Sequence, residues 1–476
     1  MSHGAWRVAD VRAAEDALMA KLPEGTLMQR AATGLATRCA HLLDGNLYGA
    51  RILLLVGAGN NGGDALYAGA RLAKRGARVQ ALLLDKDRAH QKGLTALRSA
   101  GGSTVDRVPS TVDIVLDGIV GIGGRGGLRP EAAARVAEAA RSSRAVVAVD
   151  IPSGVDADTG AVEGEAVTAD VTVTFGCLKP GLLVGAGAAH AGLVDLVDIG
   201  LRPRVPPALR LATRSDIQEW WPVPKRESDK YTRGVVGLAT GSKTYPGAAV
   251  LSVAGACAGP TGMVRYAGAA AEYVKLRHPS VIVSERAADA GRVQAWVCGS
   301  GLGTDEHGAA ELRTVLAAPV PVCLDADALT LLVDGSMAHA LRDRKAPVVV
   351  TPHDREYARL AGAPPGPDRV GSALRLAAQL NATVLLKGDR TVVAGPDGEA
   401  WVNPTGTAAL ATGGSGDVLS GLLGSLLAGG LPPIRAAVAA AYAHGLAGRR
   451  AAEGGPVTAS DVADALRPTV GDLTGR

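Results

Sequence analysis

The stretch ILLLVGAGNNGGDALYAGARLAKRGARVQALLL, residues 52–84, decides the fold class of the first half of the chain. Its two aliphatic runs, 52–57 and 79–84, have the length and composition of buried strands. The segment between them contains a glycine-rich turn and a helical pattern over 64–74. A strand, a helix and a second strand in this order predict two parallel strands joined by a helical crossover.

The same alternation continues along the chain. Further apolar runs occur at 113–118, 146–151 and 171–176, with a helical pattern at 130–141. After residue 234, strand-like runs separated by helices rich in Ala and Leu occur at 235–240, 293–299, 321–326, 347–351, 383–388 and 391–395. Both halves are therefore predicted to be α/β, with parallel sheets covered by helices.

The segment 201–234 interrupts this alternation. It is rich in proline, carries two adjacent tryptophans, Trp220 and Trp221, and contains the mixed-charge run KRESDKYTR. Such a composition is typical of a connection between compact units. A chain of 476 residues is also too long for one ordinary core, because domains cluster at about 100 to 200 residues. We predict two domains, 1–212 and 213–476.

Composition limits the class of protein. With 47% hydrophobic and 20% charged residues, the chain should fold, and its charge of +4 without long like-charge runs argues against a nucleic-acid or membrane partner. The five scattered cysteines are expected to be buried reduced thiols. The N-terminal residues lack the apolar core of a secretory signal, so we expect a cytoplasmic protein. The uncharged runs 244–264 and 418–434 are expected to form helices buried in a soluble core.

The first glycine-rich turn is a candidate ligand site. In VGAGNNGGDAL, residues 56–66, the glycines leave backbone amides free to face a phosphate where a helix begins. Asn60, Asn61 and Asp64 add oxygen atoms that suit a cation or sugar hydroxyls. The alternative is that the glycines only shape a tight turn.

Two later strands end in acids that precede glycine. Asp117 leads into GIGGRGG, residues 121–127, and Asp150 leads into IPSG, residues 151–154. The carboxyl ends of parallel strands share one edge of a sheet, so these acids can converge with the first turn on one pocket. Lys179, in FGCLKPG, adds a cation. Each acid taken alone could be a cap, and the lysine could be a solvated surface residue.

Together, NNGGD, the glycine-rich loop after Asp117, DIPSG and the TFGxxKPG pattern resemble the NAD(P)H-hydrate epimerase family. The resemblance implies a Rossmann-like domain that interconverts the R and S epimers of hydrated NADH and NADPH at C6 of the nicotinamide ring. It implies a K⁺ ion held by Asn61, Asp117 and Ser153. Asp150 would act at the reacting ring, with Lys179 as a proton donor or electrostatic partner. The implied substrate-binding residues are Asn60, Asn61, Gly62, Gly63, Asp64, Gly121, Ile122, Gly123, Gly124, Arg125, Gly126, Gly127 and Asp150.

The segment NPTGTAALATGGSGDVLSGLLGSLLAG, residues 403–429, carries the strongest signal of the second half. Gly413, Gly414 and Gly416 precede a long apolar helix, an arrangement that can form an anion hole for a phosphate. Asp417 then falls in the first helical turn, where it either stabilises the helix or accepts a hydroxyl proton during phosphoryl transfer. The lysine of a Walker sequence is absent.

Other segments fit around this turn. TPHDREYARL, residues 351–360, provides His353 for substrate contact and Glu356 for ordering metal-bound water, although His353 taken alone favours a structural role. KGDRT, residues 387–391, provides a lysine and a threonine in a strand-turn-strand. In TGSKTYPGAAVLS, residues 240–252, small residues such as Ala248 leave room for a flat ring.

These segments, with KYTRG, GxGLG and LDADAL, resemble the ribokinase-like superfamily and its ADP-dependent NAD(P)H-hydrate dehydratase branch. The resemblance implies an α/β/α sandwich in which Asp417 deprotonates the ring hydroxyl while phosphate is transferred to it, with Mg²⁺ and with ADP as donor, ATP remaining open. Loss of the phosphorylated hydroxyl then regenerates NADH or NADPH. Ser300 stands where the family often has proline. The implied ring contacts are Ala248, Gly301, His353 and Asp417, and the implied nucleotide contacts are Lys387, Gly388, Asp389, Arg390, Thr391 and Gly416.

The sequence thus predicts a bifunctional, homo-oligomeric repair enzyme for hydrated NADH and NADPH, abbreviated NADHX and NADPHX. The alternative is a ribokinase-like kinase of a small alcohol with a non-catalytic N-terminal binding domain. The presence of Asp117, Asp150, Ser153 and Lys179 together argues against that alternative.

Overall fold

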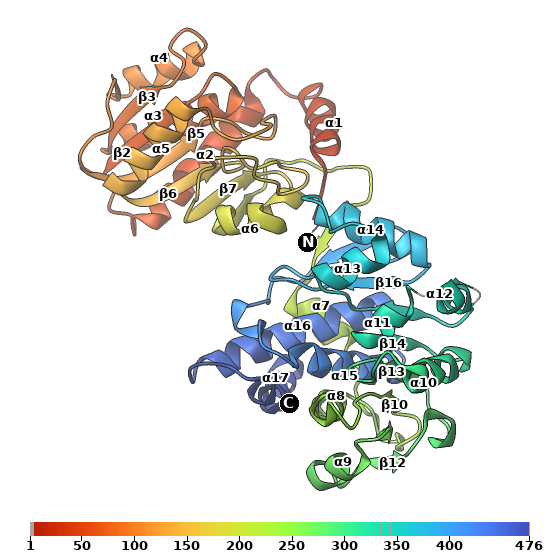
Figure 1. Ribbon diagram of the computed structural model, residues 1–476. Helices are drawn as coiled ribbons and strands as arrows, with labels where there is room; N and C mark the ends of the chain where they lie inside the picture. The colour runs from red at the N-terminus through yellow and green to blue at the C-terminus, as the bar shows by residue number, and fades with distance from the viewer. Residues whose placement is uncertain (1–3, 334, 343, 476) are drawn as a thin grey trace. The chain divides into compact units, whose positions relative to one another are not determined.

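The computed structural model describes residues 4–333, 335–342 and 344–475. The chain divides into two compact units, Met1–Leu209 and Arg210–Arg476, coloured red to yellow and green to blue in Figure 1. The division falls beside the proline-rich segment that follows residue 200. Each unit has its own sheet and its own apolar core.

The first unit is built on a seven-stranded, fully parallel sheet with the order β4-β3-β2-β5-β6-β7-β8. From β2 the chain runs outward through β3 and β4, then returns to β5 on the other side of β2. This reversal opens a crevice at the carboxyl ends of β2 and β5. The strands are β2 (Arg51–Val56), β3 (Arg78–Leu83), β4 (Ser103–Val105), β5 (Val112–Gly118), β6 (Ser143–Val149), β7 (Val171–Phe175) and β8 (Leu193–Val197).

Helices cover both faces of this sheet. Alternate residues of β2 point to opposite sides, so Leu54 packs in the core under α2 and α3 while Leu53 packs in a second core with α5. Helix α3 begins at Asn60, four residues before the start expected at Asp64, because the NNGG segment already has helical conformation. The helices are α1 (Val8–Met19), α2 (Thr26–Leu42), α3 (Asn60–Lys74), α4 (Gln91–Ser99), α5 (Pro130–Ser142) and α6 (Gly185–Ala191).

The second unit contains a larger mixed sheet, in which strands β9 to β18 have the order β9-β18-β17-β16-β15-β14-β13-β10-β11-β12. The strands from β16 to β12 are parallel neighbours, and only β17 pairs in antiparallel fashion with β16 and β18. The strands are β9 (Leu209–Leu211), β10 (Val235–Ala239), β11 (Met263–Ala267), β12 (Ile282–Ser284), β13 (Ala295–Cys298), β14 (Val322–Leu324), β15 (Val348–Val350), β16 (Thr383–Leu386), β17 (Val392–Ala394) and β18 (Ala400–Val402).

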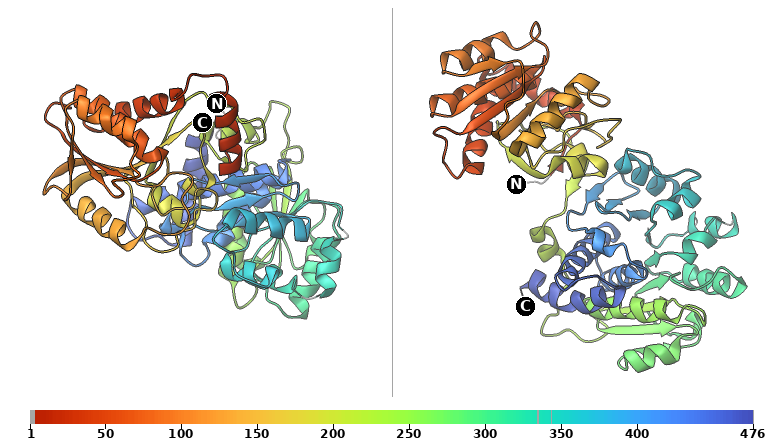
Figure 2. Two further views of the ribbon diagram at one scale, coloured as in Figure 1. Left: turned by 90° about the horizontal axis from the view of Figure 1, so that it is seen from above. Right: turned by 60° about the vertical axis from the view of Figure 1, so that its left-hand side comes forward.

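Two layers of helices enclose the second sheet, which gives the α/β/α sandwich (Figures 1 and 2). An apolar core of the second unit lies under α7 (Arg214–Trp220), α8 (Pro246–Ala258), α15 (Ser415–Ala428), α16 (Pro433–Ala452) and α17 (Ala459–Thr474). The other helices are α9 (Ala271–Arg277), α10 (Glu306–Ala317), α11 (Asp327–Leu331), α12 (Gly335–Arg342), α13 (Asp354–Ala361) and α14 (Arg369–Leu380). The predicted fold class is confirmed.

Some local expectations were wrong. The segment 201–234 is not only a connection, because it contains β9 and α7. Ile217 and Trp221 are buried in the apolar core of the second unit. The expectation of buried thiols fails for Cys257, which is exposed on α8, while the other four cysteines are buried. The uncharged runs form α8 and α15 with their following segments. No helix in the described part of the chain is long and apolar enough to cross a membrane.

Candidate active sites

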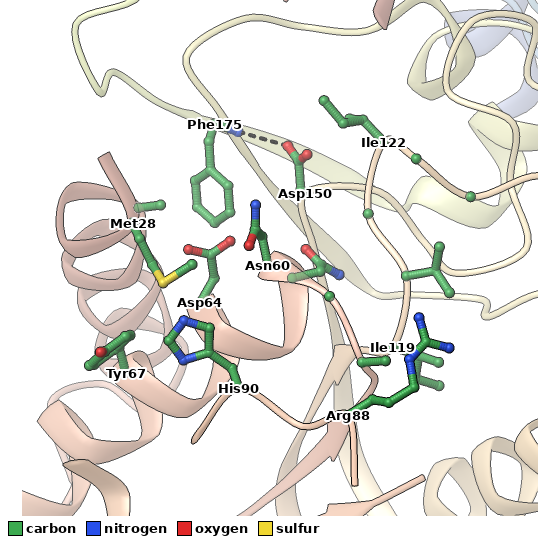
Figure 3. A pocket seen from close by; sticks show the side chains of 18 of the residues that line it. Met28, Asn60, Asp64, Tyr67, Arg88, His90, Ile119, Ile122, Asp150 and Phe175 are labelled. Atoms are coloured by element: carbon green, nitrogen blue, oxygen red, sulfur yellow. Dashed lines mark hydrogen bonds between the residues drawn. The ribbon is translucent and has the colours of Figure 1, made fainter. Parts of the chain in front are cut away.

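A cavity of about 1850 Å³ lies in the first unit at the carboxyl ends of β2, β5, β6 and β7. The whole predicted loop 121–127 lines it, together with Asn60, Asn61, Asp64 and Asp150 (Figure 3). Gly62 and Gly63 do not line the cavity. A Cβ atom on Gly62 would lie 2.5 Å from the carbonyl oxygen of Gly57, so this glycine lets α3 approach the end of β2.

Asp150 is the acid that faces this cavity from the end of β6. Its backbone has a φ of 68°, a strained conformation that turns the residue out of the strand. Its Oδ1 atom accepts hydrogen bonds from Lys179 Nζ at 2.5 Å, from Thr174 Oγ1 at 3.0 Å and from the Phe175 amide at 3.2 Å. These three hydrogen bonds all go to Oδ1, which leaves Oδ2 available to the cavity.

Lys179 lies behind Asp150, with only 1% of its surface exposed, and does not line the cavity. Its ammonium group donates to Asp150 Oδ1, to Thr174 Oγ1 at 2.9 Å and to the Phe175 carbonyl at 3.1 Å. Three donors and three acceptors match, so the lysine is fully satisfied where it lies.

Asp117, near the end of β5, and Ser153, which follows Asp150, form a second buried group of the first unit. Ser153 donates its amide to Asp117 Oδ2 at 2.8 Å and its hydroxyl to Asp117 Oδ1 at 2.7 Å. Burial raises the pKa of Asp117 to about 6, against the opposing effect of the Ser153 hydrogen bonds. Asn61 contacts the loop that follows Asp117, since a Cβ on Gly121 would lie 3.2 Å from Asn61 Oδ1. Its Nδ2 atom is buried without a hydrogen-bond partner.

Two further acids line the cavity near Asp150. Burial raises the pKa of Asp64 well above its usual value, and the charges of Asp150 and Glu15 add to this effect. Burial likewise raises the pKa of Glu15 on α1, with Lys179 opposing the shift. Glu15 escaped the sequence analysis because it precedes Asp150 by more than a hundred residues and belongs to no motif.

In the second unit, the predicted residues follow four parallel strands of the sheet. Lys387 comes after β16, His353 after β15, Gly301 after β13 and Ala248 after β10. These strands and β14, which lies between β15 and β13, form one parallel block, so their carboxyl ends form one edge. Ala248 and Gly301 meet directly there, because a Cβ on Gly301 would lie 2.8 Å from the Ala248 Cβ.

Lys387 is the cation at the centre of this edge. It donates to Asp325 Oδ1 at 2.8 Å and lies 3.5 Å from Glu356 Oε2. Burial lowers the pKa of Lys387, but the carboxylates of Asp325 and Glu356 outweigh burial and the net shift is upward. Asp325 lies in LDADAL, and its position directly after an apolar strand was the signal that could have identified it.

Asp417 lies in the first turn of α15, as the sequence predicts. Burial raises its pKa to about 7, and the nearby Asp325 adds to the shift. A hydrogen bond from the Ser300 side chain and the charge of Lys387 act in the opposite direction. The preceding residue, Gly416, lies beside the ion pair of Lys387 and Asp325, because a Cβ added to it would lie 3.5 Å from Lys387 Nζ.

The remaining predicted contacts are more peripheral. His353 caps α13, with Nδ1 accepting from the amides of Arg355 and Glu356 at 3.1 and 3.3 Å. Its ring is half exposed. In the turn 388–391, Gly388 and Asp389 are exposed, and Thr391 Oγ1 donates to the Gly388 carbonyl at 2.9 Å. Arg390 donates to the carbonyl of Pro404 at 3.2 Å.

Comparisons with known proteins identify the family of each unit. Residues 24–181 match the family described as YjeF-related protein N-terminus, and residues 236–467 match NAD(P)H-hydrate dehydratase. A ribokinase-like superfamily protein of Enterococcus faecalis has a structure that covers 56% of this chain and 98% of its own, at 26% identity and a TM-score of 0.52.

Two curated relatives carry the name bifunctional NAD(P)H-hydrate repair enzyme. The protein of Mycobacterium leprae is 50% identical over 457 residues, which is 95% of each chain. That of Mycobacterium tuberculosis is 52% identical over 402 residues, which is 84% of each chain. The chain described here therefore belongs to the family of bifunctional NAD(P)H-hydrate repair enzymes, which combine an NAD(P)H-hydrate epimerase with an NAD(P)H-hydrate dehydratase.

Proposed function

We propose that the two activities are divided between the units, with epimerisation in residues 1–212 and dehydration in residues 213–476. The first unit converts R and S hydrates of NADH and NADPH into one another at C6. The second consumes the S form and returns NADH or NADPH at the expense of ADP. The two family matches support this division, because they fall on either side of residue 212.

In the epimerase unit, we assign the reacting end of the cavity to Asp150. Its Oδ2 is available to the cavity, whereas Lys179 is buried and satisfied, so Asp150 exchanges the proton and Lys179 holds it in place. The substrate phosphates bind at the first turn of α3 and along the loop 121–127. Free amides at a helix N-terminus and a glycine-rich loop both favour anions.

The K⁺ ion implied by the resemblance fits the group formed by Asn61, Asp117 and Ser153. All three side chains are buried, and Asn61 Nδ2 is a buried atom without a partner. The two ends of an amide are interchangeable in its assignment, so the Asn61 oxygen can equally face a cation. A cation there would keep Asp117 ionised. We expect the thermal unfolding of the first unit to shift to lower temperature when K⁺ is exchanged for tetramethylammonium.

In the dehydratase unit, the position of Asp417 is the observation that best supports the proposed function. Its carboxyl group lies at the N-terminus of α15, beside Gly416 and near the cation Lys387. A phosphate at this helix end would lie next to a base whose pKa of about 7 suits proton transfer at neutral pH. Asp417 would remove the proton of the C6 hydroxyl as its oxygen attacks the terminal phosphorus. AMP is left from ADP. The C6–O bond of the resulting phosphate ester then breaks, inorganic phosphate leaves with the bonding electrons, and C5 gives a proton to water, which forms the C5–C6 double bond.

The nucleotide would lie along Lys387, Thr391 and Gly416, with Mg²⁺ entering on its phosphates. No three His, Cys, Asp or Glu side chains within the described ranges cluster so that they could hold a metal by themselves. Mg²⁺ suits such a site, because it commonly binds through one or two carboxylates, several waters and substrate phosphates. Asp325 and Glu356 are the buried carboxylates available for this.

The test uses separated R and S hydrates of NADH with the whole enzyme, Mg²⁺ and either ADP or ATP. We expect the S form to regain the absorbance of NADH at once and the R form to follow. Consumption of the S form alone would remove the epimerase assignment, and consumption of neither would overturn the proposal. Comparison of ADP with ATP identifies the donor. Assembly as a homo-oligomer in the cytoplasm stays a prediction, which sedimentation and cell fractionation would check.

A further inference from the structure

Three carboxyl groups gather at one end of the cavity of the first unit. Glu15 comes from α1, Asp64 from α3 and Asp150 from the end of β6, and all three line the cavity. Figure 3 shows the side chains of Asp64 and Asp150 pointing into the same region from different elements, with Asn60 between them. The inference drawn from this cluster rests on the proposed epimerase function of the unit.

The buried positive charge near these three acids is too small to neutralise all of them in their ionised forms. Lys179 is the one buried cation beside them in the described structure, and it pairs with Asp150. Arg12 also lines the cavity, but it is exposed. Three carboxylates against one buried ammonium leave an excess of negative charge, and like charges in a confined site keep a proton bound to at least one of the acids.

Asp64 is the acid that keeps this proton. No side chain in the described ranges forms an ion pair or hydrogen bond with it, whereas Asp150 has Lys179, Thr174 and Phe175 as donors. Burial, with the charges of Asp150 and Glu15, raises the pKa of Asp64 far above its usual value. His90 and Tyr67, which also line the cavity, pack edge to face with ring centroids 5.6 Å apart.

We propose that Asp64 is the second catalytic residue of the epimerase, a carboxylic acid that exchanges a proton with ring nitrogen N1 while the Asp150 carboxylate exchanges one with the C6 hydroxyl. Carbon 6 of the hydrated ring bears a hydroxyl and is bonded to N1, so it can open as a hemiaminal does. A carboxyl pair in which one member is neutral and the other ionised supplies the acid and the base for such a step.

The step balances without a co-reactant. Asp150 accepts the hydroxyl proton, the C6–N1 bond breaks with its electron pair going to N1, and Asp64 delivers its proton to N1. The product is an open-chain aldehyde. Rotation about C5–C6 then presents the other face of the aldehyde to N1. N1 attacks C6 and re-forms the ring, while it returns its proton to Asp64 and Asp150 protonates the aldehyde oxygen. Both acids end in their starting states, and C6 has the opposite configuration.

Glu15 is a positioning residue for this pair. It acts through its charge, which raises the pKa of Asp64, and it lies before the matched family segment 24–181. Loss of its charge should therefore make Asp64 release its proton at lower pH. The rival assignment makes Asp64 a simple binding contact, as the resemblance implies. A binding contact would change the KM for the hydrate rather than kcat.

The experiment follows R-to-S conversion by chromatography with the full-length enzyme and no nucleotide, so that dehydration is silent. In wild type, kcat should fall as pH rises through the pKa of Asp64, because the protonated form is needed. We expect Asp64→Asn to lower kcat about 100-fold or more, with little change in KM and without that high-pH decrease. Asp64→Glu should restore part of the rate, and Glu15→Gln should move the decrease to lower pH.

Two controls separate the possible failures. Addition of ADP and Mg²⁺ with pure S hydrate reports on the second unit, which should be unaffected in every variant. Asp106→Asn removes an exposed acid of the first unit, paired with Lys86, and should match wild type. If wild type does not interconvert the epimers, the proposed function fails. If wild type does, but Asp64→Asn keeps its kcat and its pH profile or changes only KM, the role of Asp64 is overturned.

Discussion

Asp417 shows how a single residue links the local environment to the pH dependence of dehydration. Its pKa is raised to about 7 by burial first and by Asp325 second, while the hydrogen bond from Ser300 lowers it. A general base acts in its ionised form. Dehydration of the S hydrate should therefore have a kcat/KM that increases about tenfold per pH unit below pH 7 and levels off above it.

Two variants test this origin of the pH profile. Asp417→Asn should lower kcat by a factor of about 100 to 10,000 and remove the dependence. Ser300→Ala should move the increase to higher pH, because the variant lacks the hydrogen bond that stabilises the ionised form. A profile that keeps its position in Ser300→Ala would contradict the assignment of the titrating group to Asp417. Denaturant unfolding of the second unit, followed by tryptophan fluorescence, serves as the folding control for both variants.

Residues also mark the limit of prediction from the sequence. Asp150 and Asp417 were identifiable because each follows an apolar strand or glycine turn in a recognisable string. Glu15 and Ser300 were not, because their importance comes from side chains that are distant in sequence and near in space. The fully buried state of Lys179 also has no local signal, since a lysine before Pro-Gly is commonly solvated.

At the scale of elements, buried apolar strands were predictable and partly exposed edge strands were not. The strands β2, β5, β6 and β7 overlap the apolar runs expected at 52–57, 113–118, 146–151 and 171–176. By contrast, β8 and β12 are partly exposed edge strands, and β8 has the mixed sequence LVDLV. Such strands form because a neighbouring strand supplies hydrogen bonds, so their own composition says little.

The contact between α8 and α15 leads to a test at this scale, because α15 carries Asp417. Gly255 of α8 faces the backbone of α15, and a Cβ added there would lie 2.0 Å from the carbonyl oxygen of Val418. Gly255→Ala must push the helices apart and should lower the free energy of unfolding by about 1–3 kcal/mol or more. The displaced α15 should also reduce the rate of dehydration.

Gly247 provides the matched control in the same helix. A Cβ added to Gly247 meets no atom within 4 Å, and its backbone needs no left-handed conformation. Gly247→Ala should leave stability unchanged or raise it by up to about 1 kcal/mol, as expected for alanine in place of glycine in a helix. Denaturant unfolding followed by tryptophan fluorescence compares the two variants, because four of the five tryptophans lie in the second unit. Equal unfolding midpoints would contradict the close helix approach.

For the whole molecule, the main question is whether the two units work independently on a shared substrate pool. Each unit has its own sheet, core and candidate base, and the cavity of the first unit is lined only by residues of that unit. The candidate catalytic sets therefore share no residue. Asp150→Asn should abolish epimerisation and leave dehydration of the S hydrate intact, and Asp417→Asn should do the reverse.

A mixture of the two variants tests independence with full-length chains. Neither variant alone should convert R hydrate to NADH, because the S form is either not made or not consumed. If the S hydrate diffuses freely, equal amounts of the two proteins should restore conversion at the rate set by half the normal number of each site. The absorbance of NADH gives that rate directly, and dilution of the mixture should slow it no more than it slows wild type. A mixture that stays inactive, although each variant keeps its remaining activity, would show that the two sites must belong to one chain.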